Sequence, residues 1–381
     1  MAKWRIPLYK IYWDEEDVNH LLDVIRQGMF WATGPNIEQF ETLVAQYLDR
    51  EYAVAFNSGT SALHAVLLAC GIQDGEEVIV PSFTFIATAN SVLFVNAKPV
   101  FADIETETYG LDPTDVERKI TKKTKAVMPM HYGGSSCQIR ALKEIAEDHK
   151  LLLLEDAAES LGARINGELV GSFGDAAMFS FCGNKVITTG EGGMIVTDQR
   201  DIYERLKLIR SHGRLETENY FTSIQSGDYV VLGYNWRMSN ITAALGVTQL
   251  EKLDKLIEMR RRNAAYMSKN LSDVSKMAPP NPPEGVFHVY QMYTVRVKSG
   301  EKARDGLRDH LATKGVMTKV YFSPVHLTHF YREKCGFKGG ELPVTEELSN
   351  KVLSLPMYAS MTTDDMDYVT DSVRDFLQKT G

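Results

Sequence analysis

The sequence has 381 residues, of which 44% are hydrophobic and 24% are charged, as in an ordinary globular enzyme. A single core rarely grows to this size, so we expect one large and one small domain. The formal net charge of -8 disfavours a nucleic-acid-binding protein. No apolar run has the length of a signal peptide or a membrane span, and the four cysteines form no Cys-x-x-Cys pair. These features predict a cytoplasmic enzyme with free thiols.

Two amphipathic helices, at residues 14–30 and 37–48, begin the predicted structure. A short strand at residues 52–56 follows, and then Asn57-Ser58-Gly59-Thr60-Ser61 opens a helix that ends near residue 70. The first N–H groups of a helix have no internal partner, and the helix dipole favours negative charge there. This turn therefore predicts an anion site, although a simple N-cap explains the same residues equally well.

Strands and helices then alternate. The apolar run Leu151–Leu154 is typical of a strand buried on both faces of a parallel sheet, and it leads directly to Asp156. The alternation predicts a doubly wound α/β domain. Its other elements are strands at 77–80, 99–102 and 125–129, a helix that ends near residue 94, and a helix at 141–148.

A lysine stands between two later strands. The first strand ends near Ser180, a short turn presents Lys185, and a glycine-rich turn leads into a second strand at 194–197. The sites of open α/β sheets lie at strand ends, where an exposed lysine can form a Schiff base with an aldehyde cofactor such as pyridoxal phosphate, PLP. Most lysines beside strands are nevertheless surface charges. The glycines of this turn lead into a strand without the Gly-x-Gly-x-x-Gly spacing, so a nicotinamide site is excluded.

The anion site, Asp156 and Lys185 together match the needs of PLP: donors for its phosphate, a carboxylate for its pyridine nitrogen and an amine for its aldehyde. A buried carboxylate without a partner is costly, and a protonated pyridine nitrogen would compensate its charge. A capping or ion-paired aspartate is the alternative. Phe85, at the start of a helix, fits either stacking on the cofactor ring or the core.

The C-terminal part reads as a separate α+β unit. After helices at 201–211 and 241–253, a charged helix at 256–271 has the length of a connector, and a proline-rich stretch follows it. We therefore place a large domain at residues 1–254 and a small one at residues 255–381. The small domain is predicted to contain strands at 289–297 and 318–322 and helices at 304–314 and 363–378.

No metal site is predicted. His326 and His329 can share a helical face, but the sequence offers no nearby carboxylate to complete a ligand set.

Five motifs, in order and spacing, resemble those of the sugar-nucleotide aminotransferases, which are PLP enzymes of fold type I in the aspartate aminotransferase superfamily. The resemblance covers essentially the whole chain. Within the family, the segment Gly183–Gly193 is most similar to that of the GDP-perosamine synthases and related enzymes, which aminate C4 of a 4-keto-6-deoxy sugar. The motifs are Asn57–His64, Pro81–Phe85, Glu155–Glu159, Phe179–Gly193 and Gly233–Arg237.

The resemblance implies a role for each matching residue. Lys185 would hold PLP and move the proton, Asp156 would pair with the pyridine nitrogen, and Glu159 would lie near the ring hydroxyl. Asn235 would reach the cofactor of a neighbouring subunit, which implies a homodimer. The other implied contacts are Phe85 stacked on the ring, the phosphate site formed by Ser58, Gly59, Thr60, Ser61 and Ser180, and a sugar contact from His326.

The resemblance also implies the substrates: L-glutamate as amino donor and a nucleotide-linked keto sugar as acceptor. The negative net charge and the short apolar runs predict neither nucleic acid nor membrane as a partner. Relatives that dehydrate the sugar at C3 carry histidine at the position of Lys185, so transamination is expected. Two alternatives remain open: an aminotransferase acting at C3 of a keto sugar, and a PLP-binding regulatory protein without turnover.

Overall fold

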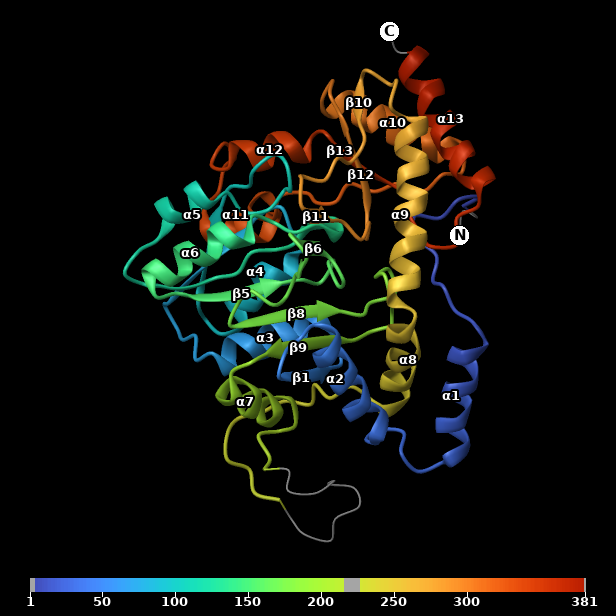
Figure 1. Cartoon of the computed structure of the whole chain (residues 1–381). Coiled ribbons are helices and arrows are strands. Elements are labelled where there is room, and N and C mark those ends of the chain that lie inside the picture. The colour runs from blue at the N-terminus through green and yellow to red at the C-terminus, as the bar shows by residue number, and fades with distance from the viewer. Residues whose placement is uncertain (1–3, 216–226, 380–381) are drawn as a thin grey trace.

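A seven-stranded sheet lies at the centre of the molecule (Figure 1). The structure is a computed structural model that describes residues 4–215 and 227–379. In the strand order β1-β9-β8-β5-β4-β2-β3, only β9 runs against the others, so the predicted doubly wound, mostly parallel sheet is confirmed. The strands are β1 (Tyr52–Phe56), β2 (Glu77–Pro81), β3 (Lys98–Ala102), β4 (Thr124–Val127), β5 (Leu152–Asp156), β8 (Ala176–Ser180) and β9 (Gly193–Thr197).

Helices cover both faces of this sheet, because consecutive strand residues point to opposite sides. Val54 packs into the apolar cluster beneath α3 and α4, whereas Ala55 packs into the cluster with α2 and α8. The helices of this part are α1 (Glu15–Gln27), α2 (Pro35–Tyr47), α3 (Gly59–Ala69), α4 (Ile86–Phe94), α5 (Pro113–Lys119), α6 (Ile139–His149), α7 (Arg200–Arg210) and α8 (Asn240–Glu251).

The long helix α9 (Leu253–Asn270) leads from α8 into a second, C-terminal part (Figure 1). There a three-stranded sheet in the order β10-β12-β13 packs with α10 and α13 around a core of its own. The elements are β10 (Met277–Ala278), β12 (Tyr293–Val297), β13 (Val352–Leu355), α10 (Glu301–Thr313), α11 (His329–Cys335), α12 (Pro343–Ser349) and α13 (Thr363–Lys379).

Short segments of each part pack against the other part. Ile6, near the start of the chain, packs in the C-terminal core and bridges to Val316. A small sheet joins β11 (Val286–Phe287) to β6 (Arg164–Ile165) and β7 (Glu168–Leu169). The division at residue 254 remains a prediction, and residues near Ile6 pack with the C-terminal part.

The predicted strand at residues 318–322 was wrong. In that segment Lys319 makes only an isolated bridge to Ser354, and the carbonyl oxygen of Tyr321 accepts a hydrogen bond from the Tyr132 hydroxyl at 2.6 Å. A side chain of the large part therefore takes a bond that a sheet ladder would need. The two strands that pair with β12 are β10 and β13. Among the described residues, no helix is long and apolar enough to cross a membrane.

Candidate functional site

A cavity of about 540 Å³ opens where β5 and β8 end and α3 begins. This is the edge at which open α/β sheets carry their sites, because the backbone leaves the packed interior there. The predicted site residues that line it are Ser58, Gly59, Thr60, Phe85, Asp156, Glu159, Ser180 and Lys185.

Lys185 lies in the turn after β8, where its backbone N–H donates to the Cys182 carbonyl oxygen at 3.0 Å. Its Nζ atom is 3.5 Å from Oε1 of Glu159, and the other oxygen of Glu159 accepts the backbone N–H of Gly133 at 2.9 Å. Burial raises the pKa of the Glu159 carboxyl, and the lysine charge opposes this shift. The carboxylate thus holds the amine at one place in the cavity.

Asp156 ends β5 and is only 3% exposed. Its carboxylate accepts hydrogen bonds from the Thr88 hydroxyl at 2.7 Å and from the Ala158 backbone N–H at 3.2 Å. Burial raises the pKa of this carboxyl, while both hydrogen bonds and the charge of Lys185 act in the opposite direction. Within the described residues, no cation lies within ion-pair distance of it. A protonated pyridine nitrogen fits this place, because it would supply the missing positive charge.

The beginning of α3 forms the anion site. Ser58 caps the helix by accepting the Ser61 backbone N–H at 3.1 Å, which leaves the N–H groups of Gly59 and Thr60 at the open end. A Cβ atom on Gly59 would lie 3.2 Å from the Ser180 Cβ, so glycine lets the helix end approach β8 closely. This cradle fits a phosphate group.

Phe85 precedes α4 and lines the same cavity with 60% of its surface exposed. This exposure rules out the core role that the sequence left open. Its ring face is available to a flat cofactor ring.

Ser61 does not reach the cavity, because its hydroxyl donates to Oδ1 of Asn57 at 2.6 Å. Asn235 is exposed and also lies outside the cavity of its own chain. The places of Ser61 and Asn235 neither support nor contradict the phosphate contacts that the resemblance implies for them.

His326 lies away from the cavity and is completely buried. Its ring nitrogens bond to the Ser82 hydroxyl at 2.6 Å and to Glu346 at 3.1 Å. The expectation that no carboxylate lies near this histidine was wrong, since Glu341 and Glu346 both approach it. The Glu341 carboxylate accepts the backbone N–H of Gly339 and the Glu346 carboxylate that of Gly340, so both have hydrogen-bond donors and we assign no metal. The position fits a structural role better than a sugar contact.

Several residues that line the cavity were not identified from the sequence, because they come from segments that lie far from the predicted motifs in the chain. Lys319, Tyr321 and Phe322 come from the segment predicted to be a strand, and Leu8 and Tyr9 come from the start of the chain. Thr88 lies in the first turn of α4, with no local signal that its hydroxyl faces Asp156. The remaining lining residues are Leu63, Thr84, Ala87, Met130, Ala158, Met178, Cys182, Asn184, Glu191 and Met317.

Comparison with known proteins identifies the family. Residues 12–374 match the DegT/DnrJ/EryC1/StrS aminotransferase family. The chain belongs to this family. It is also 36% identical to the GDP-perosamine synthase of Escherichia coli O157:H7 over 371 residues, which is 97% of this chain and 98% of the relative. The enzyme is therefore a PLP-dependent sugar aminotransferase.

Solved structures agree with this assignment. The enzyme superposes on DesV of S. venezuelae, solved in complex with a ketimine intermediate, with a TM-score of 0.89 and 32% identity over 98% of this chain and 99% of the other. It superposes on Helicobacter pylori PseC, an aminotransferase of pseudoaminic acid biosynthesis, with a TM-score of 0.92 and 27% identity over 98% and 99%.

Proposed function

We propose that the enzyme transfers the amino group of L-glutamate to the C4 keto group of a nucleotide-linked 4-keto-6-deoxy sugar. The observation that carries this proposal is the single cavity that joins Lys185, Asp156 and an anion cradle. The choice of C4 is supported by the segment Gly183–Gly193 and by the similarity to a GDP-perosamine synthase.

PLP, when bound, would supply an aldehyde for the amine and a ring that stores electrons. Lys185 would hold the cofactor and, once released, its Nζ atom would move a proton between the α-carbon of the amino acid and the cofactor carbon that carried the aldehyde. Asp156 would keep the pyridine nitrogen protonated, and Glu159 would orient the lysine across their 3.5 Å contact. Phe85 would cover the ring and exclude water.

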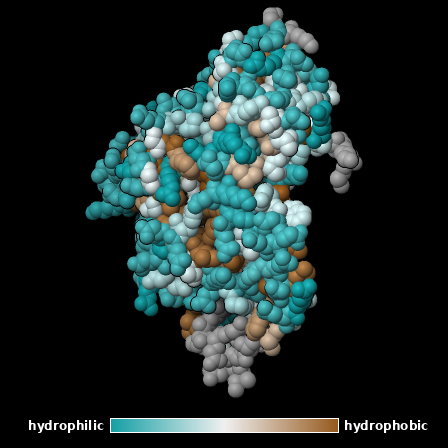
Figure 2. Space-filling view, turned by 45° about the vertical axis from the view of Figure 1, so that its right-hand side comes forward, coloured by the Kyte–Doolittle hydropathy of each residue, from teal (hydrophilic) through white to brown (hydrophobic). Residues whose placement is uncertain are grey.

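Two further proposals concern the oligomeric state and the cellular location of the enzyme. We propose a homodimer in which Asn235 donates to the phosphate of the neighbouring cofactor. Its support is the exposed apolar run Tyr229–Leu232 close to Asn235 in the chain, together with the apolar side chains that gather on one face in Figure 2. The absence of disulfides among the four cysteines supports a cytoplasmic location.

The first test of the function is the visible spectrum of the purified holoenzyme. L-glutamate is expected to lower the long-wavelength absorbance band of lysine-bound PLP. A separate absorbance band, that of the aminated cofactor, should rise at the same time. A panel of nucleotide-linked 4-keto and 3-keto sugars then identifies the acceptor, with the position of the new amine read by NMR. Amination at C3 would favour the alternative aminotransferase, and a spectrum that responds to no donor would favour a PLP-binding protein without turnover.

Replacing Asn235 by alanine tests the shared site. One charge-assisted hydrogen bond contributes about 1.5–3 kcal/mol, so the affinity for PLP is expected to fall about 10- to 100-fold. PLP titration of the apoenzyme measures this, and sedimentation should show dimers for the variant and the native enzyme alike. Asn350→Ala, at an exposed position, is the control. A monomeric native enzyme, or unchanged affinity in Asn235→Ala, contradicts the proposal.

A further inference from the structure

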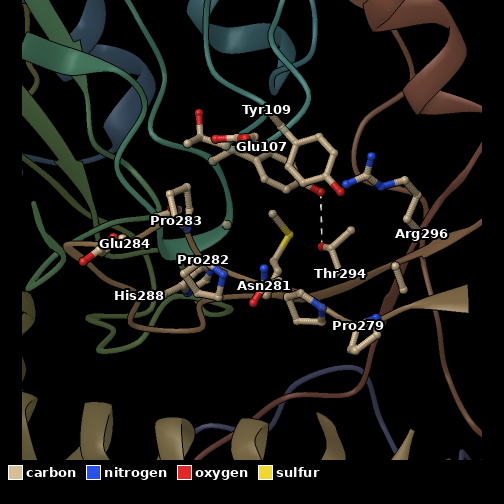
Figure 3. A pocket seen from close by; sticks show the side chains of 17 residues that line it. Glu107, Tyr109, Pro279, Asn281, Pro282, Pro283, Glu284, His288, Thr294 and Arg296 are labelled. Carbon is tan, nitrogen blue, oxygen red and sulfur yellow. Dashed lines mark hydrogen bonds between the residues drawn. The ribbon is translucent and has the colours of Figure 1, made fainter. Parts of the chain in front are cut away.

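A second cavity, of about 470 Å³, lies between the two parts of the chain (Figure 3). The large part contributes the loop Glu107–Tyr109 and residues near Tyr132, and the C-terminal part contributes the proline-rich segment Pro279–Pro283 and β12. Of the residues that line it, Gly133 bonds to Glu159 through its backbone N–H, and the proposed transfer reaction gives a role to no other. The volume is in the range of small-molecule sites, which is about 300–1,000 Å³.

Arg296 of β12 gives this cavity its positive charge. Its Nε atom is buried and has no hydrogen-bond partner among the residues that the structure describes. One terminal nitrogen donates to the Thr106 carbonyl oxygen at 3.4 Å, and the guanidinium carbon is 5.8 Å from the centre of the Tyr109 ring. A guanidinium binds phosphate and carboxylate groups especially well, and that of Arg296 lines the cavity. An anionic group on a ligand would therefore complete this site.

The rest of the lining favours a flat ring. In Figure 3 the ring of Tyr109 lies above Pro279 and Pro282, with Thr294 at the level between them. Proline and tyrosine rings offer apolar faces for stacking. The carboxylates of Glu107 and Glu284 stand exposed among the lining residues, so further negative charge on the ligand would be repelled.

We propose that this cavity binds a small ring compound with a single phosphate or carboxylate group, which pairs with Arg296 while the ring stacks between Tyr109 and the prolines. The ligand would lie one layer of residues from the catalytic cavity. The Tyr132 hydroxyl in the shared wall donates to the carbonyl oxygen of Tyr321, which lines the catalytic cavity. Bound there, it would join the two parts of the chain and stabilise the folded enzyme.

Calorimetric titration of the PLP-loaded enzyme tests the proposal. The probes are UMP and GMP as ring phosphates, 4-hydroxybenzoate as a ring carboxylate, and inorganic phosphate as an anion without a ring. At least one ring compound is expected to bind saturably, to bind more tightly than inorganic phosphate and to raise the melting temperature. Binding of the nucleotides alone identifies a phosphate ligand, and binding of 4-hydroxybenzoate alone identifies a carboxylate ligand.

Two variants separate this site from the catalytic cavity. Arg296→Gln is expected to weaken the binding at least about 10-fold, since it removes a charged hydrogen-bond donor. Asn281→Trp, from an exposed position in the proline-rich segment, is expected to fill the cavity and block binding without touching the core. Arg308→Gln, at a half-buried arginine of the same part of the chain that lies outside this cavity, is the control.

The proposal is overturned if no ring compound binds saturably, or if inorganic phosphate binds as tightly as the ring compounds. It is also overturned if the binding survives both cavity variants, because it then belongs to the catalytic cavity. If Arg296→Gln lowers the melting temperature of the ligand-free enzyme, a loss of binding in that variant could reflect lost folding. The binding measured with Asn281→Trp then decides whether the ligand occupies this cavity. These titrations need no substrate turnover, so their result is independent of whether the proposed transfer reaction is correct.

Discussion

Replacing Lys185 by alanine is expected to lower kcat by at least about 100-fold, and up to about 10⁴-fold, which is the usual contribution of a positioned acid–base group. The amine is the only one that the described residues place beside Glu159 within ion-pair distance. The anion cradle at α3 and the Asp156 carboxylate stay intact in this variant. The protein should therefore still bind PLP, while the long-wavelength band of the lysine-bound cofactor is lost.

Steady-state assays and visible spectra measure both effects. Lys185→Arg keeps the positive charge beside Glu159, but a guanidinium does not lose its proton in proteins, so this variant should be inactive too. Lys143→Ala, on the exposed face of α6, should behave as the native enzyme. A Lys185→Ala enzyme with full transaminase activity would remove the basis of the proposed function.

Replacing Glu155 by glutamine is expected to lower the free energy of unfolding by about 3 kcal/mol, because buried donors lose their acceptor. The Glu155 side chain is fully buried and bonds to Nε2 of His131 at 3.0 Å. It also accepts three backbone N–H groups, from Gly171 at 2.9 Å, Phe173 at 2.8 Å and Gly174 at 2.7 Å. A glutamine amide would point N–H groups at some of these donors. Urea unfolding monitored by circular dichroism measures the loss, with the exposed Glu147→Gln as control.

The same carboxylate should make stability depend on pH. Burial alone would raise the pKa of Glu155, but the bonds from His131 and the glycine N–H groups outweigh it and hold the pKa below the ordinary value of 4.5. A carboxyl with a lowered pKa in the folded state stabilises the protein above its ordinary value, and this contribution disappears as the pH falls through the folded value. The free energy of unfolding of the native enzyme should therefore fall as the pH drops below the ordinary pKa of 4.5. That of Glu155→Gln should change less over the same pH range. Parallel profiles would contradict this role.

The sequence was sufficient to predict the parts of the fold and the site that local patterns determine. The apolar run of β5 places Asp156 at a strand end, and the turn after β8 places Lys185 at the next one. The small helix α5 was missed although Asp112 caps it and Pro113 occupies its first turn, which is a recognisable start signal. The hydroxyl of Thr88 and the side chain of Tyr321 could not be assigned, because only packing between distant segments aims them at the cavity.

The wall of the catalytic cavity also fixes an order of events during synthesis. Leu8 lines that cavity, and its carbonyl oxygen accepts the backbone N–H of Met357, close to the other end of the chain. Ile6 likewise meets Val316. Chains emerge from the ribosome with the N-terminus first, so Ile6 and Leu8 cannot reach these places until Val316 and Met357 have been synthesised. A nascent chain can therefore complete this wall of the cofactor cavity only after Met357 has been synthesised.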